Sequence, residues 1–286
     1  MGPGGASPPD PRSFSPTSNT YRLNMRTDLV PYADIAEYLK REDTVLIPVG
    51  ATEQYGPHLA TGTELRLCEL MAQQVAEITG FAVVPIMPFN YSCMFLDYPG
   101  TLTVKMETVE AYLGEMCHGL AEQGFKHFFF VNIHAGSLGP IESICRSLRK
   151  EWGAVGGLID VFSIMRDVAG VTYTTDKAPT GHASEMVTSA ALHVCPEYVF
   201  MDRVQAPPPL RSFVDGVKTV SSGKVSFGKS SFQVFSDISD YTPLGMQGDA
   251  SAANAEQGKV IWETSRAYIA EAAKKFSGMV LKPEAA

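Results

Sequence analysis

Apolar residues along this chain follow two kinds of pattern that alternate from one segment to the next. Continuous apolar runs predict buried β-strands at 45–49, 82–86, 127–133 and 157–162, because a strand covered on both faces is hydrophobic throughout. Apolar residues at helical spacing predict α-helices at 34–40, 64–79, 106–123, 139–152, 184–193 and 250–275. This alternation indicates an α/β fold with three layers, in which a mainly parallel sheet is flanked by helices.

Two segments depart from the alternation. Residues 1–20 are rich in Gly, Pro and Ser, a composition that buries too little apolar surface to fold, so we expect a disordered leader. No linker divides the remainder, and 21–286 is predicted to be a single domain. Within that domain, 213–241 is rich in Ser, Gly and Val. We expect it to form an irregular or hairpin excursion that could approach the site or a neighbouring subunit.

The overall composition excludes several classes of partner. The net charge is −8 without long acidic or basic runs, which argues against nucleic-acid binding. No apolar stretch approaches the roughly 20 residues that span a bilayer, and the first residues lack the pattern of a signal peptide. The 5 cysteines form no CxxC pair, as expected for reduced thiols. We therefore expect a cytoplasmic protein with neither a membrane nor a nucleic-acid partner.

Polar residues that follow the predicted strands are the first candidates for chemistry. Glu53 comes soon after the first strand, Glu64 opens the next helix, and His134 follows the third strand. Sites in parallel sheets lie at the carboxyl ends of the strands. Carboxylates and imidazoles suit zinc and manganese, and a metal site with an open position lowers the pKa of bound water to about 7. Each residue also has an ordinary reading: a solvated loop carboxylate, a partner of the helix dipole and a structural histidine.

A second candidate pair lies further along the chain. His182 and Glu185 are three positions apart, so on a helix they would share a face. The same pair could equally form a hydrogen-bonded helix start. Spacing alone leaves both readings open.

Several ordered motifs resemble those of the creatininase (creatinine amidohydrolase) family. The stretch GATEQYGPHL at 50–59 resembles the family pattern G-[ST]-x-E-Q-H-G-P-H-L, and Glu64 stands where the family has the Asp of Thr-Asp. YPGTL at 98–102 resembles F-P-G-T-L, NIHAG at 132–136 resembles N-G-H-G-G-N, and HASEMVTS at 182–189 resembles H-A-G-E-x-E-T-S. GD at 248–249 and AEQG at 255–258 resemble the closing motif.

This resemblance implies a metal-dependent hydrolase that cleaves the C–N bond of a non-peptide or cyclic amide in a small molecule. Metal-bound water would be the nucleophile, and the protein would form a homo-oligomer, often a hexamer. By the same resemblance Glu53, Glu64 and His134 bind one divalent metal, with zinc as the first choice and manganese or iron as alternatives. Glu185 is the candidate carboxylate for a second metal.

Two departures from the family pattern fall on ligand positions. Tyr55 replaces a ligating histidine, and Glu64 is one methylene longer than the family's aspartate. A neutral phenol is a poor metal ligand, so Tyr55 could instead donate a hydrogen bond to the developing oxyanion, with Glu185 or His182 as general base. The alternatives are a catalytically altered member that binds a small molecule, and a non-hydrolytic enzyme such as a lyase, isomerase or cyclase.

Overall fold

The computed structural model describes residues 25–168, 170, 173, 180–207, 209–221 and 223–281. The leader expected at 1–20 lies outside these residues. Among the described residues, no helix is both long enough and apolar enough to cross a bilayer.

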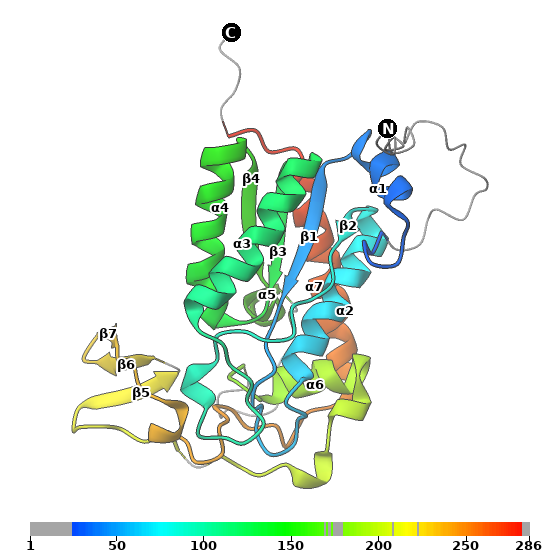
Figure 1. The fold of residues 1–286 in the computed structure, drawn as a ribbon. Coiled ribbons are helices and arrows are strands. Elements are labelled where there is room, and N and C mark those ends of the chain that lie inside the picture. Colours follow the sequence, from blue (N-terminus) through cyan, green and yellow to red (C-terminus); the bar gives the residue numbers. More distant parts are fainter. Residues whose placement is uncertain are drawn as a thin grey trace, which may run out of the picture.

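A four-stranded parallel sheet forms the centre of the fold (Figure 1). Its strands are β1 (Thr44–Val49), β2 (Ala82–Val83), β3 (His127–Asn132) and β4 (Val155–Asp160), in the order β2-β1-β3-β4. The register pairs Val49 with Asn132 and Asn132 with Asp160. β1, β3 and β4 therefore end side by side at the carboxyl end of the sheet, and the segments that follow them begin close together.

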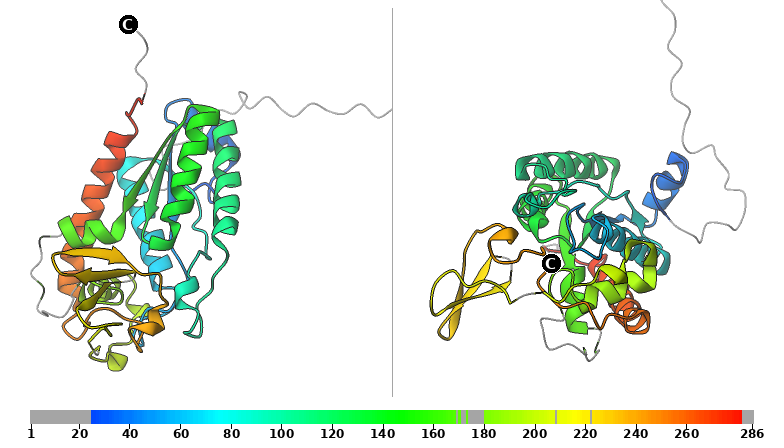
Figure 2. Two further views of the ribbon diagram at one scale, coloured as in Figure 1. Left: turned by 90° about the vertical axis from the view of Figure 1, so that its left-hand side faces the viewer. Right: turned by 90° about the horizontal axis from the view of Figure 1, so that it is seen from below.

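Helices cover both faces of this sheet and complete three layers (Figures 1 and 2). One face packs on α1 (Tyr32–Leu39), α3 (Met106–Gln123) and α4 (Leu138–Trp152), and the other on α2 (Thr63–Thr79), α5 (Val161–Val168) and α7 (Ala255–Phe276). α6 (Glu185–Val194) packs on α7 beyond the carboxyl end of the strands (Figure 1). Because successive side chains in a strand point to opposite faces, Phe128 and Phe130 enter the first core while Phe129 enters the second. The predicted α/β architecture is confirmed.

The predicted boundaries differ from the observed ones at two strands. The strand expected at 82–86 ends at Val83, two residues before Pro85, which has no N–H to donate to a ladder. The strand expected at 157–162 occupies Val155–Asp160 instead, and α5 follows it immediately. Asp160 starts this helix by accepting hydrogen bonds from Phe162 N (3.1 Å) and Ser163 Oγ (2.7 Å). The sequence analysis took the first apolar residues of α5 as strand.

The segment predicted to form a hairpin excursion holds a separate antiparallel sheet. It contains β5 (Val217–Ser221), β6 (Lys224–Phe227) and β7 (Ser230–Gln233), in the order β5-β6-β7. We call residues 217–233 the arm, because they extend sideways from the carboxyl end of the main sheet (Figures 1 and 2). The predicted excursion is confirmed.

Candidate metal centre

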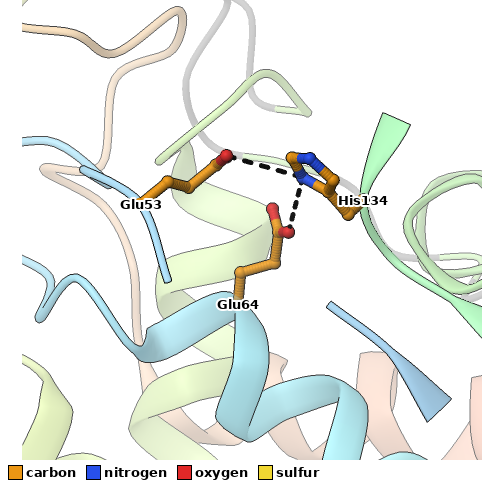
Figure 3. Close-up of side chains that lie close together, drawn as sticks. All are labelled: Glu53, Glu64 and His134. Carbon is orange, nitrogen blue, oxygen red and sulfur yellow. Dashed lines mark ion pairs between the residues drawn. The ribbon is translucent and has the colours of Figure 1, made fainter. Parts of the chain in front are cut away.

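Three segments bring ionisable side chains together beyond the carboxyl end of the main sheet (Figure 3). Glu53 lies in the loop after β1, Glu64 in the first turn of α2, and His134 directly after β3. The parallel pairing of β1 with β3 places the first and third of these segments side by side. All three side chains are almost completely buried, with exposed fractions of 1%, 3% and 3%.

The distances between the three side chains fit a single small cation. His134 Nδ1 lies 3.0 Å from Glu64 Oε1 and 3.5 Å from Glu53 Oε2. One ligand atom from each residue lies within 4.8 Å of the others. Tetrahedral zinc with bonds of about 2.1 Å separates its ligand atoms by about 3.4 Å. Two carboxylate oxygens and one imidazole nitrogen are also a donor set that zinc and manganese accept.

Hydrogen bonds around His134 favour the tautomer that binds metal. His134 Nε2 lies 2.8 Å from the carbonyl oxygen of Tyr91, so the proton on Nε2 is assigned to that bond and Nδ1 presents its lone pair to the carboxylates. Glu64 Oε1 faces this nitrogen and, among the described residues, accepts no hydrogen bond although it is fully buried. A buried carboxylate oxygen 3.0 Å from an imidazole nitrogen needs either a proton or a metal ion between the two atoms.

The electrostatics of the metal-free cluster lead to the same conclusion. Burial and the neighbouring Glu64 raise the pKa of Glu53 to about 7, although Ser92 Oγ donates a hydrogen bond of 2.6 Å to its carboxylate. Burial lowers the pKa of His134, but Glu53 and Glu64 outweigh it and raise the pKa to about 10. Without a metal the cluster therefore retains protons at neutral pH. A divalent cation would replace them.

Tyr55 and His182 lie beside the cluster. Burial and the charges of Glu64 and Glu53 raise the pKa of Tyr55 well above its usual value. The ring of Tyr55 lies 4.0 Å, centroid to centroid, from that of His182. His182 Nε2 donates to the carbonyl oxygen of Gln54 (3.0 Å), while Nδ1 lies 4.0 Å from Glu53 Oε1. Burial lowers the pKa of His182, so this imidazole is neutral at pH 7.

Comparisons with known proteins agree with this geometry. A family model described as creatinine amidohydrolase matches residues 29–273. The chain belongs to the creatininase family. The mycofactocin precursor peptide peptidase of Mycobacterium ulcerans (strain Agy99) is 27% identical over 230 residues, which cover 77% of this chain and 80% of the relative. The creatinine amidohydrolase of Pseudomonas putida is 24% identical over 208 residues, covering 65% of this chain and 80% of the relative.

The fold comparison extends over nearly the whole chain. A solved creatininase described with manganese superimposes with a TM-score of 0.72 at 21% identity, covering 90% of this chain and 100% of that one. Family membership and the buried ligand set together support a metal-dependent hydrolase.

The structure decides between the two readings of His182 and Glu185. α6 begins at Glu185, and His182 lies before it, across Ala183 with a φ of 57°. The reading in which both residues share a helix face does not hold, because the left-handed backbone at Ala183 turns the chain before the helix starts. Glu185 is buried, and its N–H donates to the carbonyl oxygen of Asp249 (3.0 Å). It is neither part of the three-residue cluster nor among the residues that line the adjoining cavity.

A cavity of about 410 Å³ adjoins the cluster in this creatininase-family protein. Besides Tyr55 and His182, its wall includes the apolar residues Phe95, Ile133, Leu138, Phe162 and Val220. Val220 belongs to β5, so the arm contributes to the wall.

Sequence reasoning missed three functional candidates at this site: Ser92, Asp160 and Arg166. Asp160 could have been found, since it ends β4 as Glu53 and His134 follow β1 and β3. Arg166 and Ser92 carry no motif that distinguishes them from ordinary surface or loop residues.

Proposed function

We propose that this protein hydrolyses the C–N bond of a small non-peptide or cyclic amide at a divalent metal held by Glu53, Glu64 and His134. The observation that carries the proposal is the buried convergence of these three side chains, each of which offers one ligand atom within 4.8 Å of the others. Zinc is the first choice, with manganese or iron as alternatives. When bound, the ion supplies Lewis acidity and activates water as a nucleophile at neutral pH.

His182 is proposed as the general base. Its Nδ1 carries no proton when Nε2 donates to the carbonyl oxygen of Gln54, and it lies 4.0 Å from a carboxylate oxygen of Glu53. Nδ1 can therefore accept a proton from a water at the cluster and return it to the leaving nitrogen. The rings of Tyr55 and Phe95, at centroid distances of 4.0 and 4.8 Å, hold the imidazole in place.

Tyr55 is proposed to act as a neutral donor and not as a ligand. Its raised pKa keeps the proton on the hydroxyl oxygen. The hydroxyl could therefore donate to an oxyanion that develops at the reacting carbon. The three donors Glu53, Glu64 and His134 support the proposal of one metal, and the second-metal role of Glu185 stays a prediction.

The cavity favours a small substrate. Its volume of about 410 Å³ lies within the range of roughly 300–1,000 Å³ that is typical of small-molecule pockets. Its largely apolar wall would surround the body of such a molecule. The second candidate is an amide within a peptide, which the likeness to a mycofactocin precursor peptide peptidase favours.

The test has two readouts, bound metal and turnover. Purified protein should hold about one equivalent of metal per chain, and Glu53→Gln should weaken metal affinity by more than the roughly 10–100-fold that loss of a supporting hydrogen bond to a ligand costs. Glu77→Gln is the matched control, since it neutralises an exposed carboxylate on the helix that carries Glu64. Metal content well below one equivalent, unchanged by added zinc, manganese or iron, would contradict the proposal.

Turnover is measured on formamides, lactams, cyclic ureas and short peptides with metal-loaded protein. Hydrolysis of a cyclic or non-peptide amide that is lost in Glu53→Gln supports the proposal. Cleavage confined to peptides favours the second candidate. Full metal occupancy with no hydrolysis of any of these classes would favour a binding protein or a non-hydrolytic enzyme.

A further inference from the structure

Arg166 brings a positive charge to the wall of the cavity. It lies on α5, the helix that follows β4. Of the described residues that line the cavity, Arg166 is the only lysine or arginine, whereas three carboxylates share the wall: Glu53, Glu64 and Asp160. Two of these carboxylates are the candidate metal ligands. The ion pair that Arg166 forms is with Asp167, which is not among the residues that line the cavity.

The guanidinium group is held along one edge. Its Nε donates to Asp167 Oδ1 (2.7 Å) and its Nη2 to Asp167 Oδ2 (3.0 Å). Within the described part of the chain, Asp167 is its only hydrogen-bond partner, so the edge that carries Nη1 is left for another acceptor. An arginine fork fixed in this way matches the two oxygens of a carboxylate.

The carboxylate of Asp160 is not that acceptor. Among the described residues no hydrogen bond or ion pair joins it to Arg166, and its two oxygens instead accept hydrogen bonds from Phe162 N and Ser163 Oγ that cap α5. The cavity thus contains a donor edge that its own acidic residues do not use, separate from the cluster of Glu53, Glu64 and His134.

We propose that the substrate is an amide that also carries a carboxylate, and that Arg166 binds this carboxylate while the amide lies at the metal. The inference rests on the proposed function, because the metal centre anchors the other end of the substrate. The apolar wall between the two ends would contact the substrate's carbon skeleton. Arg166 is then a specificity-determining residue that selects anionic amides over neutral ones.

A series of dicarboxylates of increasing chain length tests the inference without a known substrate. Malonate, succinate, glutarate and adipate are titrated into zinc-loaded protein, each against the monocarboxylate of the same carbon number. One carboxylate can bind at the metal, and the second reaches Arg166 only at a suitable length. At that length we expect the dicarboxylate to bind about tenfold tighter or better, the typical gain from a charged hydrogen bond.

Variants assign this gain to Arg166. Arg166→Gln should abolish it, and Arg166→Lys should retain part of it, because the charge stays but the fork is lost. Arg146→Gln is the matched control: Arg146 also uses Nε and Nη2 to bind one carboxylate, that of Glu142, but it does not line this cavity. The control should keep the full gain.

The outcomes separate this inference from the proposed function. Two outcomes overturn the role of Arg166 when metal content is about one equivalent. In the first, no dicarboxylate binds more tightly than its monocarboxylate, and in the second, the tighter binding persists in Arg166→Gln. Protein that binds no metal overturns the proposed function, and this inference with it. If Arg166→Gln loses metal through misfolding, Arg166→Lys decides, since an unchanged gain in a variant that lacks the fork would also overturn the inference.

Discussion

The carboxyl end of the main sheet buries ionisable side chains, whereas the arm exposes apolar ones. At the sheet end, the ionisable Glu53, Glu64 and His134 are almost completely buried. In the arm, large apolar side chains are exposed, with exposed fractions of 63% at Phe227 and 50% at Phe232. Buried charge is tolerated only where hydrogen bonds or a metal offset its desolvation. The arm is a small antiparallel sheet with little core of its own, which contributes little to stability.

Stability and chemistry therefore depend on different parts of this fold. The main sheet and its covering helices provide the hydrophobic core, and the site lies at the edge of that core. The arm adds Val220 and Ser221 to the cavity wall. The homo-oligomer expected from the family resemblance stays a prediction.

The largest expected difference between the two regions is in how much a phenylalanine side chain contributes to stability. Phe130→Ala, in the centre of β3 where the side chain is fully buried, should lower the free energy of unfolding by about 3–5 kcal/mol. Phe232→Ala in β7 should change it by less than about 0.5 kcal/mol. Urea unfolding of both variants measures the two effects. Similar losses from both would show that the arm is part of the stabilising core.

A smaller effect concerns the buried His58, in the loop between Glu53 and Glu64. Its Nε2 lies 2.9 Å from Thr188 Oγ1, Nδ1 has no hydrogen-bond partner among the described residues, and burial lowers the pKa of His58 from 6.5 to about 4. A depressed histidine pKa contributes stability that is fully present above the unfolded pKa and is lost as pH falls toward the folded one. From about pH 7.5 to 5 we expect His58 to account for a loss of about 2 kcal/mol in the free energy of unfolding.

Urea unfolding at a series of pH values checks this contribution. His58→Gln should flatten the decline over that range, even if the variant is less stable throughout. An equally steep decline in His58→Gln would mean that the site region does not bury this histidine in its neutral form.

The smallest expected effect is at Ala183, whose φ of 57° makes it the only non-glycine residue with a positive φ in the described part of the chain. Ala183→Gly should change the free energy of unfolding by less than about 0.5 kcal/mol, because the relieved backbone strain offsets the loss of a buried methyl group and the added chain entropy. Ala111→Gly, on an exposed position of α3, should lower it by about 1 kcal/mol. Denaturant midpoints of the two variants measure both effects. A loss at Ala183→Gly larger than that at Ala111→Gly would show that this backbone is unstrained.

Much of the fold could be predicted because its signals are local. The apolar run at 45–49 and the helical periodicity at 106–123 each correspond to an observed element. The boundary between a strand and a helix was less predictable where apolar residues continue from one element into the next. Val161 and Phe162 extend the apolar pattern of β4, but Asp160 caps α5 at that point and makes them helical.

The candidate site was predicted in part. Glu53, Glu64 and His134 follow strands or open a helix, and the parallel sheet brings them together. The relation between His182 and Glu185 could not be predicted, because it depends on the positive φ of Ala183. Arg166 was missed because its place in the cavity wall depends on how α5 packs and not on any local pattern.

The order of strands and helices, the family, and the three side chains with the chemistry to hold a metal can be read from the sequence alone. These follow from hydrophobic periodicity and from residue types at particular places along the chain, which are local properties. The structure was needed to show that Glu64 Oε1 lies 3.0 Å from His134 Nδ1, that Glu185 does not line the cavity and that Arg166 does. Those facts depend on distances between segments far apart in the sequence, and the packing of helices on the sheet sets such distances.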